Sequence, residues 1–269
     1  MSERPRAFFR ESGRGAAVVC LHSSASSSAQ WRPLMDRLGC RYRTLAADLY
    51  GSGKSPTWPG PRPLSLGDEV ALLDPVFAAA GQRCHLVGHS YGGAVALAAA
   101  LARPERLESL VLFEPVLFSL LVAEDPEQAA AREIGAVRDD TIAALERGDP
   151  YASGERFVDY WMQAGAWAAM PPPRRDAIAA LMSTVKGEWQ AVFGEPTPLP
   201  AFADLDVPVL YLTGSASPAS GRGVGRLLTK VLPRVTAVEL DGVGHMGPVT
   251  HPDRVNALIE RHLDGAPVH

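Results

Sequence analysis

Short runs of consecutive apolar residues alternate along the chain with longer amphipathic stretches. Six runs are typical of strands buried on both faces, at residues 17–22 (AVVCLH), 44–49 (TLAADL), 84–89 (CHLVGH), 107–113 (LESLVLF), 207–213 (VPVLYLT) and 235–240 (VTAVEL). Helices are expected between them, at residues 30–38, 66–80, 91–102, 223–232 and 252–263. Strands that alternate with helices form βαβ units, so the pattern predicts an α/β fold with a mainly parallel sheet.

One long stretch interrupts this alternation. Between Pro115 and Pro200 the chain is rich in alanine and shows no strand pattern, and three consecutive prolines punctuate it at 171–173. We interpret it as a helical insertion between two strands of the sheet. Its large apolar side chains either pack together or line an apolar pocket: Trp161, Met162, Trp167, Met170, Met182 and Trp189.

Composition and charge narrow the possible partners and location. The 269 residues are 46% hydrophobic and carry a net charge of −4, which argues for a globular protein and against nucleic-acid binding. The longest apolar run, 94–102, is too short for a membrane helix, and residues 1–15 lack the apolar core of a signal peptide. Cys20, Cys40 and Cys84 lack metal-binding spacing and are interpreted as buried free thiols in a reducing compartment. We therefore expect a cytoplasmic protein that binds neither nucleic acid nor membranes.

The strongest chemical signal is the sequence Gly88-His89-Ser90-Tyr91-Gly92, which fits G-x-S-x-G. It stands between a predicted strand and a predicted helix, the setting of a nucleophile elbow, in which a sharp turn holds a serine at its apex. Side chains two residues before and after the serine would collide, which explains the glycines. We interpret Ser90 as a nucleophile, and the alternative is a turn that needs its glycines for the backbone alone.

A serine hydroxyl is a weak nucleophile and needs a base. His245 stands in a glycine-rich loop (DGVGHM) just after the last predicted strand, at the sheet edge where Ser90 is expected. The chain order serine, acid, histidine also favours it. His251 is more typical of a helix start, and His262 and His269 are expected in solvent.

Two loops could supply the acid that orients this histidine. The loop 214–218 contains no carboxylate, whereas Glu114 directly follows a buried strand, where an unpaired charge is costly. We predict that the Glu114 carboxylate accepts a hydrogen bond from Nδ1 of His245 at about 2.6–3.2 Å. The alternatives are a structurally paired Glu114 and a Ser-His dyad without an acid.

An oxyanion hole needs two backbone N–H groups. One would come from Tyr91, and the other from the serine-rich loop 22–28, which can also end in a helix N-cap. The segment 51–55 (GSGKS) looks like the end of a phosphate-binding loop, but Asp48 replaces the required glycine and prolines from Pro56 onward forbid the helix. No cofactor or metal site is therefore expected.

Together these segments resemble the α/β-hydrolase superfamily over nearly the whole chain. The pieces that match are His22 with its loop, the run from Asp48 to Ser55, the elbow around Ser90, and Gly244-His245. The chain is similar to the compact, cap-bearing serine esterase-like and lyase-like members of the superfamily. It implies an eight-stranded, mostly parallel sheet flanked by helices.

The same resemblance implies a core of residues 1–115 and 201–269, a helical cap of residues 116–200, and no cofactor. It makes Ser90 the nucleophile and His245 the base, with the N–H groups of Ser24 and Tyr91 as oxyanion donors.

Two positions depart from the family pattern. Ser23 replaces the glycine that usually follows the first histidine, and Ser217 replaces the aspartate of the loop after the penultimate strand. Some similar members place the acid one strand earlier, at the position of Glu114. Ser90 in place of an aspartate excludes epoxide opening and halide removal.

The function expected from these residues is hydrolysis of carboxylic esters of small to medium hydrophobic substrates through an acyl-enzyme. Carbon–carbon bond hydrolysis with the same triad is the first alternative. The second is a non-catalytic small-molecule binder, which the departures at Ser23 and Ser217 favour.

Overall fold

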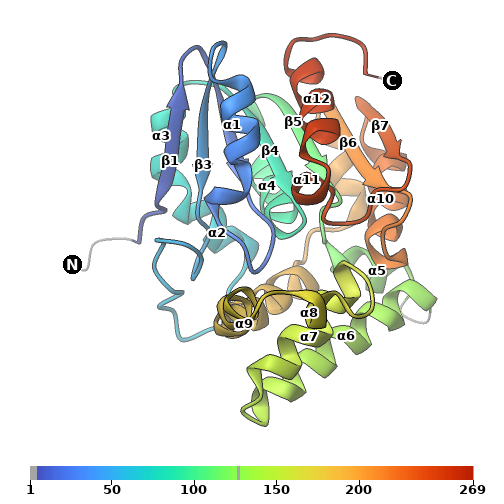
Figure 1. Ribbon diagram of the computed structural model, residues 1–269. Helices are drawn as coiled ribbons and strands as arrows, with labels where there is room; N and C mark the ends of the chain where they lie inside the picture. The colour runs from blue at the N-terminus through green and yellow to red at the C-terminus, as the bar shows by residue number, and fades with distance from the viewer. Residues whose placement is uncertain (1–4, 126–127, 269) are drawn as a thin grey trace.

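A single twisted sheet with helices on both faces organises the computed structural model, which describes residues 5–125 and 128–268 (Figure 1). The strand order is β1-β3-β2-β4-β5-β6-β7, and all neighbours are parallel except β1 and β3. The strands are β1 (Phe9–Gly13), β2 (Ala16–Leu21), β3 (Tyr42–Ala47), β4 (Cys84–His89), β5 (Leu107–Phe113), β6 (Val209–Gly214) and β7 (Val235–Leu240). The predicted α/β class and mainly parallel sheet are confirmed.

The sheet has seven strands within the described residues, one fewer than the eight expected. Before β1, two N–H groups are used outside the sheet: that of Ala7 donates to the Leu72 carbonyl at 3.2 Å and that of Phe8 to the Ser55 hydroxyl at 2.9 Å. The Phe8 carbonyl accepts from the Asp48 N–H at 2.8 Å, just beyond the β1–β3 pairing, and none of residues 5–8 belongs to a further strand. The edge strand β1 was not predicted, because its residues FRESG are polar and partly exposed and carry no apolar run.

Helices cover both faces of the sheet. One face carries α1 (Arg32–Leu38), α11 (Gly247–Thr250) and α12 (Pro252–Leu263); the other carries α2 (Leu66–Leu72), α3 (Asp74–Ala80), α4 (Tyr91–Ala102) and α10 (Ala219–Val231). Short 3₁₀ turns lie at Ser28–Trp31, Pro104–Arg106 and Leu199–Asp204. The helix predicted over 66–80 is broken at Leu73, because Pro75 has no N–H with which to continue the hydrogen bonds of α2.

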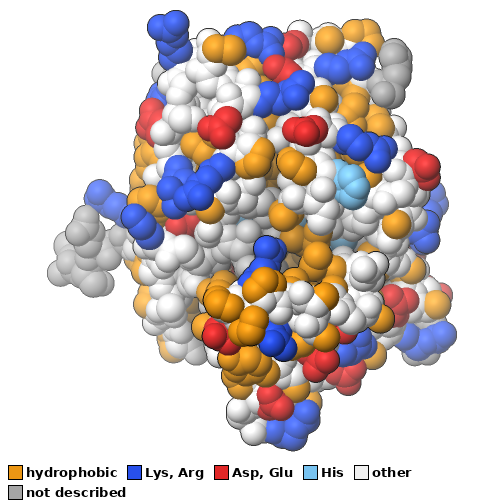
Figure 2. All heavy atoms as spheres, in the orientation of Figure 1, with side chains coloured by type: hydrophobic (Ala, Val, Ile, Leu, Met, Phe, Trp, Pro, Cys, Tyr) orange, Lys and Arg blue, Asp and Glu red, His pale blue; other side chains and the backbone are white. Residues whose placement is uncertain are grey.

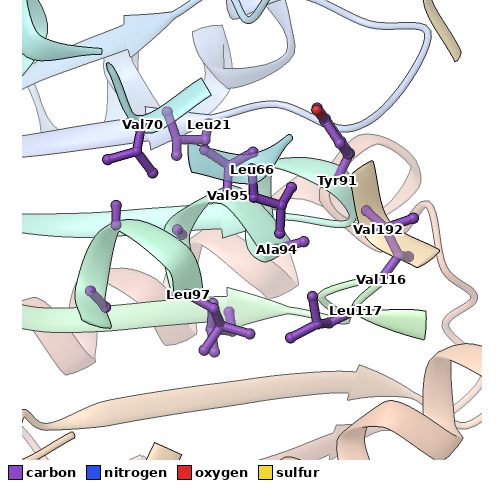
Figure 3. Packing of buried hydrophobic residues seen from close by; sticks show 14 of the residues in the cluster. Leu21, Leu66, Val70, Tyr91, Ala94, Val95, Leu97, Val116, Leu117 and Val192 are labelled. Carbon is purple, nitrogen blue, oxygen red and sulfur yellow. The ribbon is translucent and has the colours of Figure 1, made fainter. Parts of the chain in front are cut away.

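The two faces of the sheet are closed by separate apolar clusters. Figure 3 shows Leu21 of β2 beside Leu66 and Val70 of α2 and Val95 of α4, all fully or nearly fully buried. Burying a side chain of this size stabilises a fold by about 1.5–3 kcal/mol. This packing fixes α4 against the sheet and so fixes the turn that precedes it.

Five helices stand between β5 and β6, and no strand lies among the described residues of that stretch, as predicted. They are α5 (Phe118–Glu124), α6 (Ala129–Glu146), α7 (Pro150–Trp161), α8 (Ala166–Ala169) and α9 (Pro172–Gly194), and we call them the helical insertion. The insertion lies together at one end of the sheet (Figure 1). The division into a core and a cap at residues 116 and 200 stays a prediction.

The helical insertion shares the main apolar cluster of the sheet. Phe118, Trp161 and Trp189 belong to that cluster, and the Phe118 ring lies 6.2 Å from Trp161 and 6.0 Å from Trp189, centroid to centroid. Figure 3 shows Val192 of α9 near Val116, which follows β5. The described helices include none that is long and apolar enough to cross a membrane.

Candidate active site

Ser90 occupies a sharp turn between β4 and α4. Its φ is 57° and its ψ −118°, a left-handed conformation that is strained for any residue with a Cβ. The turn is held by hydrogen bonds from the Ser90 N–H to the Phe113 carbonyl (3.0 Å) and from the Gly93 N–H to the Ser90 carbonyl (2.9 Å). Strain of this kind costs about 1–3 kcal/mol and persists where the surrounding structure enforces it.

The glycines on both sides of Ser90 are required by space. A Cβ on Gly88 would lie 2.5 Å from the Gly92 carbonyl oxygen, which is the collision across the turn expected from the sequence. A Cβ on Gly92 would meet another part of the chain, the Leu21 carbonyl oxygen at 2.4 Å. The elbow therefore also depends on how closely α4 approaches the end of β2.

The three residues predicted to act together are adjacent in space. Nε2 of His245 lies 2.9 Å from Oγ of Ser90, and Nδ1 of the same ring lies 2.6 Å from Oε2 of Glu114. His245 is 1% exposed and Glu114 is fully buried. Because the carboxylate accepts, Nδ1 carries the proton and Nε2 is left to accept a proton from Ser90.

Glu114 is held rigidly at the end of β5. Its φ of 43° turns the chain, and its second oxygen, Oε1, accepts hydrogen bonds from the Gly214 N–H (2.7 Å) and the Thr213 hydroxyl (2.8 Å). Burial acts to raise the pKa of Glu114, but the hydrogen bonds from His245 and Gly214 outweigh it and leave the pKa lowered. The carboxyl is therefore ionised at neutral pH.

Both departures from the family pattern are accommodated. The N–H and hydroxyl of Ser23 donate to Oε1 of Gln30 at 3.1 and 2.9 Å, so the extra side chain is tied down. The Ser217 side chain is buried and acts to lower the pKa of Glu114. The carboxylate that contacts Nδ1 of His245 is that of Glu114.

A second set of contacts supports the histidine loop and was not foreseen from the sequence. The Gln30 amide donates to Nδ1 of His89 at 3.0 Å, and Nε2 of His89 donates to the His245 carbonyl at 2.9 Å. Burial, with the neighbouring His245, lowers the pKa of His89 to about 3, so its ring is neutral. The ring of Trp161 lies 4.1 Å from that of His245, centroid to centroid. No spacing in the sequence signals contacts between segments so far apart.

The segment 51–55, which looks like the end of a phosphate-binding loop, is held in place by the side chain of Asp48. Asp48 accepts hydrogen bonds from the N–H of Ser28 (2.6 Å) and of Lys54 (2.8 Å), and a Cβ on Gly53 would lie 2.1 Å from its carboxylate. The Lys54 N–H is therefore satisfied within the chain and is not free to bind a phosphate. In the described part of the chain no three His, Cys, Asp or Glu side chains are grouped to hold a metal ion.

The two predicted oxyanion donors border Ser90. Ser24 and Tyr91 line the same space as Ser90, and among the hydrogen bonds of the described residues none uses the N–H of either. The Gly92 N–H donates to the His22 carbonyl at 3.0 Å, which draws the loop after β2 against the first turn of α4. Both N–H groups thus remain available beside the serine.

Two cavities open at Ser90. The larger, about 520 Å³, is lined by Ser90 and His245, by the serine-rich loop after β2, and by apolar side chains of the helical insertion, including Trp161 and Met170. Figure 2 shows apolar side chains gathered where the helical insertion meets the rest of the molecule. The smaller cavity, about 10 Å³, is lined by Ser24, Ser90, Tyr91, Val116, Phe118, Phe157, Trp161, Val185, Glu188, Trp189 and Val192.

The large apolar side chains of the helical insertion were expected either to pack together or to line a pocket, and some of them do each. Trp161, Met162 and Met170 line the large cavity, and Trp189 lines the small one. Trp167 and Met182 are buried in the apolar clusters instead.

Comparison with known proteins gives a family and several relatives. Residues 18–258 match the sequence model of the Alpha/beta hydrolase family. A pimeloyl-[acyl-carrier protein] methyl ester esterase from Aeromonas hydrophila is 29% identical over 269 residues, which cover 92% of this chain and 95% of that protein. Lipase LipV from Mycobacterium tuberculosis is also 29% identical, over 92% of this chain and 93% of its own.

Solved structures share the fold. A hydrolase from Pseudomonas aeruginosa superposes with a TM-score of 0.77 at 24% identity, over 95% of this chain and 93% of that one. A thermophilic esterase from Thermogutta terrifontis has a TM-score of 0.73 at 23% identity, over 96% and 93% of the two chains.

Proposed function

The chain belongs to the alpha/beta hydrolase family, and from this premise we propose that it is a serine hydrolase that cleaves carboxylic esters through an acyl-enzyme. One observation carries the proposal: the unbroken chain of hydrogen bonds from Ser90 through His245 to Glu114. Curated relatives that span most of the chain are an ester hydrolase and a lipase. Ester hydrolysis is the reaction that this geometry performs most directly.

In the first half of the reaction, Nε2 of His245 takes the hydroxyl proton of Ser90 as Oγ attacks the ester carbonyl. Glu114 stabilises the positive charge that forms on the imidazole ring. The N–H groups of Ser24 and Tyr91 stabilise the negative charge on the carbonyl oxygen. His245 then returns the proton to the departing alcohol, and the acyl group remains on Ser90.

In the second half, water replaces the alcohol. His245 takes a proton from that water as its oxygen attacks the acyl carbonyl, and then protonates Oγ of Ser90 as the acid leaves. The buried carboxylate keeps the proton on Nδ1 throughout, because Oε2 lies 2.6 Å from that atom. Glu114 is therefore proposed as a positioning and charge-stabilising residue.

The apolar walls of the large cavity favour small to medium hydrophobic esters. A small-molecule ester is accordingly proposed as the partner, and the cytoplasm as the location. The complete Ser90–His245–Glu114 contact weighs against a non-catalytic binder, because such a protein has no need of a buried, charged acid behind the histidine.

The test is turnover of p-nitrophenyl acetate by the wild type and by Ser90→Ala. We expect the variant to lose about 10⁶ in kcat while folding normally. The matched control is Ser26→Ala, a serine that lines the same cavity without contacting His245, and it should stay active. More than a few per cent of wild-type activity in Ser90→Ala would overturn the proposal.

A further inference from the structure

The two cavities at Ser90 differ in which catalytic residue they reach. His245 and Met246 line the large cavity and are absent from the lining of the small one. Ser24 and Tyr91, the proposed oxyanion donors, line the small cavity together with Ser90. The site is therefore asymmetric about the serine.

This asymmetry orients an ester. The departing alcohol must receive its proton from Nε2 of His245, so it lies on the side of the large cavity. Ser24 and Ser90 border both cavities, so the carbonyl oxygen faces Ser24 and Tyr91 where the cavities meet. With the alcohol beside His245, the acyl substituent is directed to the small cavity. An acyl group in the large cavity would compete with the alcohol for the space beside His245.

The small cavity has room for only a very small chemical group. Its volume of about 10 Å³ corresponds to roughly one water-sized group. Its walls include Phe118, Trp189 and Val192, which are at most 4% exposed and belong to the main apolar cluster. Walls packed on all sides have little room to retreat, so the substituent on the acyl carbonyl is limited to one or two heavy atoms.

One polar side chain stands in this apolar wall. Glu188 of α9 is 2% exposed, and neither carboxyl oxygen has a hydrogen-bond partner in the described part of the chain. Burial raises its pKa to about 7, while the nearby Ser24 side chain favours the charged form. The carboxyl of Glu69 and the hydroxyl of Tyr91, both buried, are the titratable groups that feel its charge.

A buried, unpartnered carboxyl destabilises a fold unless something donates to it. The small cavity that Glu188 lines is the place from which a substrate can do so. A neutral hydroxyl suits either charge state of the carboxyl, whereas an ammonium group would bring a second charge into an apolar wall.

We propose that the substrate is an ester of a short 2-hydroxy acid with a bulky apolar alcohol, and that the acyl hydroxyl donates a hydrogen bond to Glu188 in the small cavity. The inference rests on the proposed function. It adds the orientation of the ester, the size of the acyl group and a specificity-determining residue.

The orientation is tested with two isomeric esters, hexyl acetate and methyl heptanoate. They contain the same atoms and exchange the long and short arms. We expect kcat/KM to be higher for hexyl acetate by at least about tenfold. Equal values or a preference for methyl heptanoate would overturn the proposed orientation.

The role of Glu188 is tested with butyl glycolate and butyl propionate, which differ by a hydroxyl in place of a methyl group. The readout is kcat/KM for butyl glycolate divided by kcat/KM for butyl propionate. This ratio is compared between the wild type and each variant, because glycolates are intrinsically more reactive than propionates. We expect Glu188→Leu to lower the ratio by about tenfold and to raise Tm, since it removes an unsatisfied buried carboxyl. Glu188→Gln keeps an acceptor and should keep part of the preference.

The matched control is Gln190→Leu, an exposed position on the same helix, which should leave the ratio unchanged. An unchanged ratio in Glu188→Leu would overturn the assignment of Glu188, and faster turnover of butyl glycinate than of butyl glycolate would overturn the choice of a hydroxyl. Ser90-dependent turnover of p-nitrophenyl acetate separates these failures from failure of the proposed function.

Discussion

Replacing Glu114 by glutamine tests the orientation of the histidine. Oε1 of Glu114 accepts from the Gly214 N–H and the Thr213 hydroxyl, so the amide oxygen of a glutamine must take that place. Its NH₂ group then faces Nδ1 of His245. That nitrogen is forced to accept, and the ring proton moves to Nε2.

A protonated Nε2 cannot take the proton of Ser90. We therefore expect Glu114→Gln to lower kcat by about 10²–10⁴, which corresponds to about 3–5.5 kcal/mol in the activation free energy. Steady-state hydrolysis of p-nitrophenyl acetate measures it. Thr213→Val is the control, because it removes one donor to Oε1 and leaves the contact with Nδ1. A Glu114→Gln enzyme with more than a tenth of wild-type kcat would refute the reasoning.

Two further predictions concern stability. Gly92→Ala should lower the free energy of unfolding by about 3 kcal/mol or more in chemical denaturation, because the new Cβ would lie 2.4 Å from the Leu21 carbonyl oxygen. The control Gly135→Ala, a helix position with open space around it, should raise the free energy of unfolding by about 0.5–1 kcal/mol. Equal effects of the two substitutions would contradict the packing described at the elbow. Burial raises the pKa of Glu69 to about 8, so between pH 5.5 and 7.5 this carboxyl is mostly protonated in the folded protein and ionised in the unfolded chain. Unfolding therefore releases a proton, and the free energy of unfolding falls as pH rises. Over that interval the wild type should lose about 2–3 kcal/mol more than Glu69→Gln, and parallel pH profiles would be inconsistent with a protonated Glu69.

The parts of the fold that were predictable carry local signals. The buried strands β2 to β6 read as apolar runs, and the bounds of α4 and α12 match those expected from the sequence. The expectation that residues 235–240 are buried on both faces was wrong, because β7 lies at the sheet edge and only Leu240 is buried. Strand β1 was missed because an edge strand with solvent on one side needs no apolar run. The start of α10 was placed four residues too late, at residue 223 instead of Ala219. Its glycines Gly221, Gly223 and Gly225 allow close approach to Glu114, Leu121 and Tyr211.

The candidate site likewise has contacts that could be predicted from the sequence and contacts that could not. The proximity of Ser90, Glu114 and His245 could be predicted, because each follows a strand and the carboxyl ends of parallel strands share one edge. The Gln30–His89 contact, the Trp161 ring on His245 and the cavity bounded by Glu188 could not. They depend on how the helical insertion and the loop after β2 meet the sheet, and no sequence pattern encodes that approach.

The central claim is that Ser90 is a nucleophile activated by His245. Its most direct test is covalent labelling with a fluorophosphonate, followed by mass spectrometry of the digested protein. The account predicts a single adduct on the peptide that contains Ser90, its loss in Ser90→Ala, and strong suppression in His245→Ala, which keeps the serine and removes its base. An adduct on another residue, or labelling of Ser90 that is as fast without His245 as with it, would contradict the account.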